Sequence, residues 1–310
     1  MKKILVILFF LISFIAFKGS AQINVGDSLA LVDFYNMMNG QNWYNSANWL
    51  TGPVQTWYGI SVENNRVTRL VFDPNSLVGT IPGSIGNLTA IKKIAIGNVL
   101  GSYYENSIGP LPVEIGNLIN LDTLWISQCH VPGEIPQTIG SLTNLKVLNL
   151  SNNNLTGSIP ASIGNLVNLK WILLGGNQLS GNIPSEVGSL VSLEYWDSGG
   201  NLLSGSIPVE FGNLNLLKNL GLGSNQFTGL IPPNIGDIDS LEYFTCGNNQ
   251  IIKYIPPELC NCSKLKGLNF SNNLMDGTIP PCLGLKPNFW LTIENNHFTG
   301  AIPSTFASNN

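Results

Sequence analysis

The sequence predicts an α/β solenoid: a curved superhelix of stacked coils with a parallel concave sheet, a 3₁₀ or irregular convex side and a small helical N-terminal cap. Two observations carry this prediction. Pro residues recur at a fixed spacing, and apolar residues alternate with polar ones in a short stretch of each unit, as in a half-buried strand. We expect residues 22–66 to form the cap and residues 67–310 to form about ten repeats.

The first 21 residues are expected to be a secretory signal peptide. Lys2 and Lys3 precede an apolar run that ends at Phe17, and Gly19 and Ala21 provide the small residues of a cleavage site. The run is short for a membrane-spanning helix, and no later segment is long and apolar enough to be one. We therefore expect a mature chain that is secreted or held at the cell surface, without a transmembrane segment.

The net negative charge of the expected mature chain argues against some classes of binding partner. Without the lysines of the signal peptide, 11 Lys and Arg remain against 18 Asp and Glu, so nucleic acid is not an expected partner. Only 10% of the residues are charged, whereas soluble domains average about a quarter. This composition favours a repetitive scaffold over a compact enzyme.

The predicted cap begins with an amphipathic helix. Asp27 is the expected N-cap of this helix and Gly40 its stop signal. Trp43, Trp49 and Trp57 follow, and they are expected to complete a small capping domain.

The repeat is marked by Ile-Pro and Leu-Pro pairs. Their prolines are Pro82, Pro112, Pro136, Pro160, Pro184, Pro208, Pro232, Pro256, Pro280 and Pro303. Seven of the nine intervals are 24 residues long, and the other two are 30 and 23. In residues 145–169, Leu148 and Leu150 fit a strand with one buried face, and the three-residue spacing of Ile163, Leu166 and Leu169 fits a convex 3₁₀ segment. No unit buries its apolar edge alone, so stability must come from stacking.

An asparagine recurs after seven of the expected strands, and its amide is predicted to bond the turn and the neighbouring coil. This ladder comprises Asn153, Asn177, Asn201, Asn225, Asn249, Asn273 and Asn296.

The pattern LxxLxLxxNxLtGxIPxxIGxLxxL resembles the plant-type leucine-rich repeat of extracellular receptors and of inhibitors of wall-degrading enzymes, from Val67 to about Ser304. The resemblance implies a non-catalytic binding scaffold and does not specify the ligand. The plant caps carry two Cys around a Trp-x-Gly-Val core. Here Trp57 to Ile60 fit that core, but Val62 stands at one Cys position. A disulfide-free cap resembles secreted or surface proteins of bacteria, so we expect a bacterial source.

Five cysteines cannot all pair within one chain. Cys246 and Cys262 replace inward Leu positions and are expected to be buried, while Cys129 takes a ladder position. Cys260 and Cys282 lie on adjacent coils, where either a disulfide or, with Cys262, a zinc site is conceivable. Beyond the last Pro only seven residues follow, so the final coil is expected to be exposed unless the tail caps it or the protein is longer.

The chain is not expected to be an enzyme or to hold a cofactor or metal. Its two histidines, His130 and His297, lie seven coils apart, and the acidic residues at outward strand positions are several coils from one another. Neither arrangement gives the convergent reactive groups that nucleophilic catalysis or glycoside hydrolysis requires.

Outward strand positions are the expected ligand-binding residues, because no core packing constrains them. The predicted set on the concave face is Trp125, Asn149, Trp171, Tyr195, Asp197, Asn219, Tyr243 and Thr245. Exposed aromatic rings with polar neighbours are common binding anchors, although they could also simply cover the sheet. Tyr103 and Tyr104, in the extra residues of one repeat, are possible loop contacts. The expected partner is an extracellular protein, for adhesion, recognition or enzyme inhibition; the alternative is a glycan.

Overall fold

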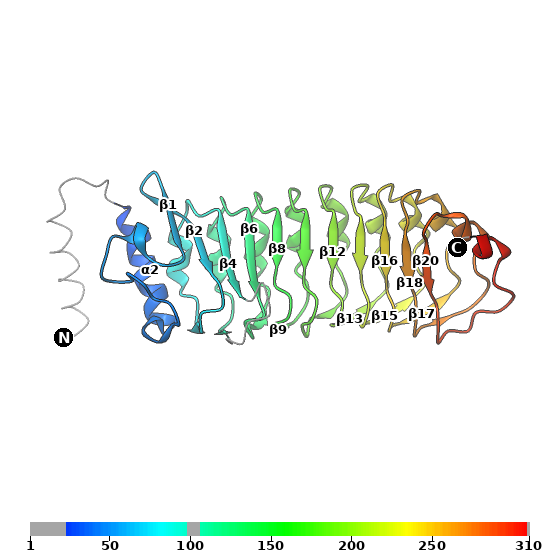
Figure 1. Ribbon diagram of the computed structural model, residues 1–310, viewed down its shortest axis with the longest axis horizontal. Helices are drawn as coiled ribbons and strands as arrows, with labels where there is room; N and C mark the ends of the chain where they lie inside the picture. The colour runs from blue at the N-terminus through cyan, green and yellow to red at the C-terminus, as the bar shows by residue number, and fades with distance from the viewer. Residues whose placement is uncertain (1–22, 98–105, 309–310) are drawn as a thin grey trace.

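The computed structural model describes residues 23–97 and 106–308, which form one elongated solenoid (Figure 1). The N-terminal cap lies at one end, and the coils follow in chain order toward the other. The predicted architecture is confirmed: a long parallel sheet, 3₁₀ turns on the convex side and one N-terminal helix. The predicted signal peptide lies outside the described residues. Within them, no helix has the length and apolar character needed to cross a bilayer.

The cap helix α2 (Val25–Met37) begins earlier than predicted. Its N-cap is Asn24, whose side chain accepts a hydrogen bond from the Asp27 backbone at 3.2 Å. The prediction that Asp27 is the N-cap was wrong, because this carboxylate is fully buried and bound to Arg66. Gly40 does not supply the left-handed residue after the helix either; Asn39 does, with φ 57°, and Gly40 starts η1 (Gly40–Asn42).

Aromatic rings form the core of the cap. The ring of Trp49 lies 5.1 Å from that of Trp43 and 4.7 Å from that of Trp57, measured between centroids. Each indole N–H donates to a backbone carbonyl, so these large side chains are buried without an unpaired donor. Beyond η2 (Val54–Thr56), β1 (Ile60–Glu63) pairs antiparallel with β2 (Arg66–Phe72) and joins the cap to the main sheet.

The main sheet runs the length of the solenoid and contains eleven strands in the described residues. From β2 onward all its neighbours are parallel, one strand per coil. The strands after β2 are β4 (Lys93–Gly97), β6 (Thr123–Ser127), β8 (Val147–Asn149), β10 (Trp171–Leu173), β12 (Tyr195–Asp197), β14 (Asn219–Gly221), β16 (Tyr243–Thr245), β18 (Gly267–Asn269) and β20 (Trp290–Thr292).

The opposite side of each coil is a 3₁₀ turn. For η3 to η11 the proline of the repeat is the N-cap, where the missing N–H and the fixed φ of proline fit the start of the turn. The turns are η3 (Gly83–Asn87), η4 (Val113–Asn117), η5 (Gln137–Ser141), η6 (Ala161–Asn165), η7 (Ser185–Ser189), η8 (Val209–Asn213), η9 (Pro233–Asp237), η10 (Pro257–Asn261), η11 (Pro281–Leu285) and η12 (Ser304–Ser308).

Short strands along a third side tie the coils together. β3 (Val78–Gly79) pairs with β5 (Ser107–Ile108), and β7 (Pro132–Glu134) pairs with β9 (Asn154–Thr156). A five-stranded ladder follows: β11 (Ser180–Gly181), β13 (Leu202–Gly205), β15 (Gln226–Gly229), β17 (Gln250–Lys253) and β19 (Leu274–Met275). The apolar core lies between these strands, the main sheet and the 3₁₀ turns.

The asparagine ladder is confirmed. Asn201 shows the pattern: its amide donates to Ser198 O at 3.0 Å in its own turn and to Leu174 O at 3.1 Å in the preceding coil. Its carbonyl accepts from the Leu179 backbone at 2.9 Å. The ladder also extends beyond the prediction, because Asn75 and Asn106 are buried in the two coils before Cys129. The inserted residues that precede Asn106 shift it out of the 24-residue frame, which hid it from the sequence.

Replacing Asn201 by Ala is expected to lower the free energy of unfolding by about 1–3 kcal/mol, since three backbone groups in two coils lose their buried partner. Asn154→Ala is the matched control, because the Asn154 side chain is exposed. Chemical denaturation of both variants measures the difference. Equal midpoints would show that the ladder bonds contribute nothing to stability.

Cys260 and Cys282 form a disulfide between η10 and η11, with 5.8 Å between their Cα atoms. The alternative zinc site is therefore excluded for these two residues. Cys246 and Cys262 are free and buried, which confirms their predicted burial, and Cys129 is free and buried as well. Burial raises the pKa of the Cys129 thiol to about 12 and that of Cys262 to about 11, and it also raises the pKa of Cys246. These thiols are protonated at neutral pH and are poor nucleophiles.

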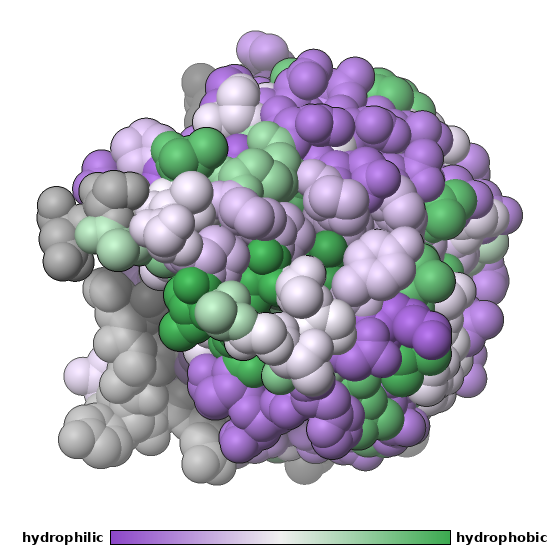
Figure 2. All heavy atoms as spheres, turned by 90° about the vertical axis from the view of Figure 1, so that its right-hand side faces the viewer, coloured by the Kyte–Doolittle hydropathy of each residue, from purple (hydrophilic) through white to green (hydrophobic). Residues whose placement is uncertain are grey.

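The surface at the end of the solenoid beyond β20 is partly hydrophobic and partly hydrophilic. Seen from that end, hydrophobic patches lie toward the middle and hydrophilic side chains gather above and below them (Figure 2). Leu285 and Ile302 are 69% and 74% exposed.

Candidate functional site

The outward strand positions align in two columns across the concave sheet, as the repeat spacing predicted. Pairing of β10 with β12 sets Trp171 beside Tyr195 and Leu173 beside Asp197. The next two strands continue the first column with Asn219 and Tyr243 and the second with Gly221 and Thr245.

Trp171 and Tyr195 are the exposed rings near the centre of this face. They are 47% and 37% exposed, and adjacent strands bring their backbones to about 4.8 Å. Ile172 and Trp196, the residues that follow them, point the other way and are fully buried. The alternation of each strand therefore leaves two large rings outside the core.

Asn149 does not lie open to a ligand, contrary to the prediction. It is only 3% exposed, because Trp125 and Leu173 flank it on the neighbouring strands. Its carbonyl accepts from the backbone and hydroxyl of Ser151 at 2.9 and 2.8 Å. Asn149 therefore stabilises the turn after its own strand. Trp125 is half-buried, its indole N–H donates to the Ser127 hydroxyl, and it lies two strands away from Trp171.

Tyr243 belongs to a second aromatic group. Its ring stacks at 6.4 Å on that of Trp290, two strands further on. Gly267 lies on the strand between them, and a Cβ at this position would collide with the Trp290 indole. The predicted track therefore divides into two parts. Trp171 and Tyr195 are neighbours on adjacent strands, Tyr243 and Trp290 stack on each other, and the half-buried Asn219 lies between the two parts.

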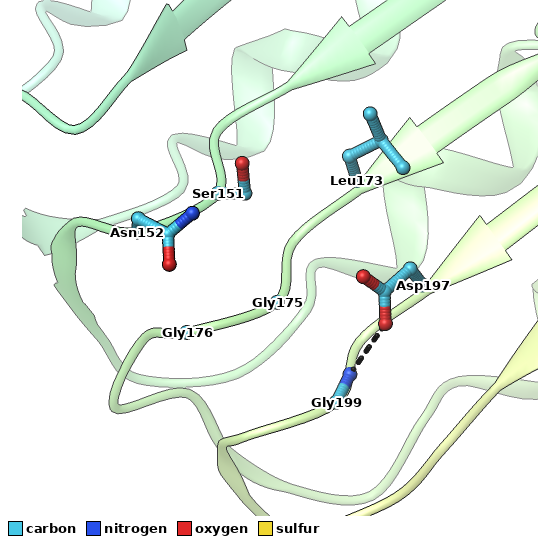
Figure 3. A pocket seen from close by; sticks show the side chains of 7 residues that line it. All are labelled: Ser151, Asn152, Leu173, Gly175, Gly176, Asp197 and Gly199. Carbon is cyan, nitrogen blue, oxygen red and sulfur yellow. Dashed lines mark hydrogen bonds between the residues drawn. The ribbon is translucent and has the colours of Figure 1, made fainter. Parts of the chain in front are cut away.

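Asp197 borders a shallow hollow of ≈ 290 Å³ at the end of β12. The hollow is lined by Ser151, Asn152, Leu173, Gly175, Gly176, Asp197 and Gly199 (Figure 3). One carboxylate oxygen accepts from the Gly199 backbone at 3.0 Å. Burial raises the pKa of Asp197, and burial together with the Asp197 charge raises the pKa of Tyr195.

Sequence reasoning missed a row of charges along the other edge of the sheet. The residue just before each first-column position is often charged, and Glu194 binds Lys170 at 3.4 Å and Lys218 at 2.7 Å. Glu242 binds Lys266 at 2.7 Å in the same way. The sequence contained a signal for these pairs, because positively and negatively charged residues alternate at 24-residue intervals from Lys170 to Lys266. These ion pairs lie at the surface, and each contributes little to stability. They nevertheless engage the lysines that are closest in sequence to the aromatic rings, so these lysines already have a carboxylate partner.

Tyr103 and Tyr104 lie outside the described residues, so their predicted role as loop contacts stays a prediction. In the described ranges, no group of three or more His, Cys, Asp and Glu is placed to hold a metal ion.

The leucine-rich-repeat model matches residues 119–179, and a second one of the same description matches residues 216–238. Among curated proteins none matches the chain. Three similar solved structures come from plants.

A plant peptide hormone receptor in complex with its peptide is 30% identical, with a TM-score of 0.76; the match covers 82% of this chain and 43% of the receptor. The ectodomain of the Arabidopsis receptor kinase HAESA with a peptide hormone is 28% identical, with a TM-score of 0.77, over 90% of this chain and 47% of its own. A plant ice-binding protein is 25% identical, with a TM-score of 0.76, over 92% of this chain and 90% of its own. The chain thus spans less than half the length of these two receptor chains.

Proposed function

We propose that this leucine-rich-repeat protein is a secreted or cell-surface, non-catalytic binding protein that holds a segment of another extracellular protein against its concave sheet. One observation carries the proposal: two large aromatic rings, Trp171 and Tyr195, stand exposed on adjacent strands beside the half-buried Asp197.

Exposed rings with a polar neighbour favour a binding surface, because a partner that covers them removes their apolar area from water and thereby stabilises the complex. The face is also low in charge: Trp171, Tyr195, Asn219 and Tyr243 follow one another in the first column. Such a surface suits an extended peptide or loop that crosses several strands.

The structural relatives support a peptide-like ligand, since two of them are receptors solved with peptide hormones. An extracellular location is supported by the predicted signal peptide and by the Cys260–Cys282 disulfide, a bond typical of oxidising compartments.

Trp171→Ala and Tyr195→Ala are each expected to weaken ligand binding by about 2 kcal/mol, or roughly thirty-fold, as central anchors of an interface do. Neither ring is part of the core, so circular dichroism and thermal unfolding should stay unchanged. Ser185→Ala, on the exposed convex turn η7, is the control. The measurement is a binding screen of the mature protein against extracellular proteins and glycans, followed by titration of the hits. Unchanged affinity in both aromatic variants would place the site elsewhere.

A glycan is the second candidate, favoured by the exposed Trp290 ring, which lies over Gly267 and stacks with Tyr243. In that case Trp290→Ala would abolish binding while Trp171→Ala had little effect. Inhibition of ice recrystallisation that survives all of these substitutions would instead indicate a use like that of the ice-binding relative.

A further inference from the structure

We propose that Asp197 is a cation-binding position of the concave face, which receives a Lys or Arg side chain, or the terminal amine, of the bound peptide. This inference rests on the proposed function and names the chemistry of its ligand: a basic peptide whose cation enters the hollow between Gly175, Gly199 and Asp197 (Figure 3).

The first argument is that the fold does not need a charge at this position. Asn149 and Asn269 stand in the same column as Asp197, and each accepts a hydrogen bond from the backbone two residues later, at 2.9 and 3.0 Å. Asp197 makes the same bond to Gly199 at 3.0 Å. A neutral amide therefore suffices for the turn, and the carboxylate adds a negative charge without a structural purpose.

The second argument is that the carboxylate is left open. At the two asparagines, a serine two residues later donates its hydroxyl to the same oxygen, at 2.8 and 2.7 Å. Next to Asp197 that residue is a glycine. Gly175 and Gly221 flank the carboxylate, and a Cβ on either would lie 3.0 Å from one of its oxygens. The absence of side chains at these positions leaves the Asp197 carboxylate open to a ligand.

The third argument is that no cation among the described residues forms an ion pair with this carboxylate. Within residues 23–97 and 106–308, none of the ion pairs involves Asp197. Lys170 and Lys218, on the two neighbouring coils, are held by Glu194 at the other edge of the sheet. A carboxylate that is half-buried without a counter-ion is costly, and the raised pKa of Asp197 reflects that burial.

The surroundings fit a peptide cation better than a bare metal ion. Asp197 is a single carboxylate, and no metal-binding group of side chains occurs in the part of the chain that the structure describes. Tyr195, on the same strand, and Trp171, on the next, offer aromatic faces that attract ammonium and guanidinium groups. The apolar stem of a Lys or Arg would pack on these rings while its charge reached Asp197.

The test is a selection of phage-displayed random dodecapeptides on the mature protein, in parallel with Asp197→Asn, Trp171→Ala and Asp276→Asn. Asp197→Asn keeps the turn bond, as the two natural asparagines show. Asp276→Asn removes the same charge from an exposed position after β19 and controls for net charge.

We expect the wild-type protein and Asp276→Asn to enrich Lys and Arg, and Asp197→Asn to lose that enrichment. In synthetic hits, replacing Arg by citrulline, or Lys by acetyl-lysine, should lower the affinity of the wild type by about ten-fold, the effect of one charged hydrogen bond. The same replacement should leave the affinity of Asp197→Asn unchanged. Acetylation of the N-terminus, tested separately, distinguishes a terminal amine from a side chain.

A cation effect of equal size in the wild type and Asp197→Asn would overturn the inference. Hits that require Trp171 but lack any cation effect would overturn it too, while leaving the concave face as the binding site. If no hit depends on Trp171 or Asp197, both the inference and the proposed function are wrong.

Discussion

Replacing Asp27 by Ala is expected to lower the free energy of unfolding of the N-terminal cap by about 3 kcal/mol, the cost of removing one partner of a buried ion pair. The fully buried carboxylate accepts two hydrogen bonds from Arg66, both at 3.0 Å, and one from the Val67 backbone at 2.7 Å. Without it, a buried N–H and a partly buried guanidinium lose their acceptor at the junction of α2 with the first parallel strand.

Asp33→Ala is the matched control, because Asp33 lies on the same helix and is exposed. Hydrogen exchange should show faster opening of the cap amides in Asp27→Ala, with distant coils unaffected, since each coil of a solenoid contacts mainly its neighbours. Exchange rates like those of Asp33→Ala would mean that the ion pair does not anchor the cap.

Removing the Cys260–Cys282 disulfide is expected to destabilise the C-terminal coils by about 3 kcal/mol, the entropy of closing a loop of this size in the unfolded chain. The bond joins η10 to η11, so the coils from η10 onward should open first. The physical reason is that the reduced chain gains conformational freedom only between these two turns.

The measurement compares unfolding of the wild type with and without reductant, and of the double variant Cys260→Ser with Cys282→Ser. Reductant should lower the stability of the wild type and leave the double variant unchanged, because the three other thiols are buried and unpaired. A reductant effect of the same size in both proteins would assign the loss to another cause.

The sequence was sufficient to predict the solenoid and the register of its strands. A period of 24 residues fixes which positions stack, and the alternation at Leu148 and Leu150 fixes which side faces the core. The repeat alone therefore places Trp171 and Tyr195 on the concave face and Asn201 in the ladder, as the structure shows.

Other features were decided by contacts that no repeat pattern encodes. The Asp27 carboxylate is buried because it pairs with Arg66, which is 39 residues away in the sequence. The Asn149 side chain is buried because the large side chains of Trp125 and Leu173 flank it on the adjacent strands.

The same is true of the hollow at Asp197, whose lining includes the glycines Gly175, Gly176 and Gly199. Periodicity determines the direction of a side chain, since every coil has the same backbone. Burial, pairing and access depend on the volume and charge of the residues that stacking brings alongside, and these differ from coil to coil. For this reason the sequence by itself determined the scaffold and the face, whereas only the tertiary structure decided which residues of that face are open to a ligand.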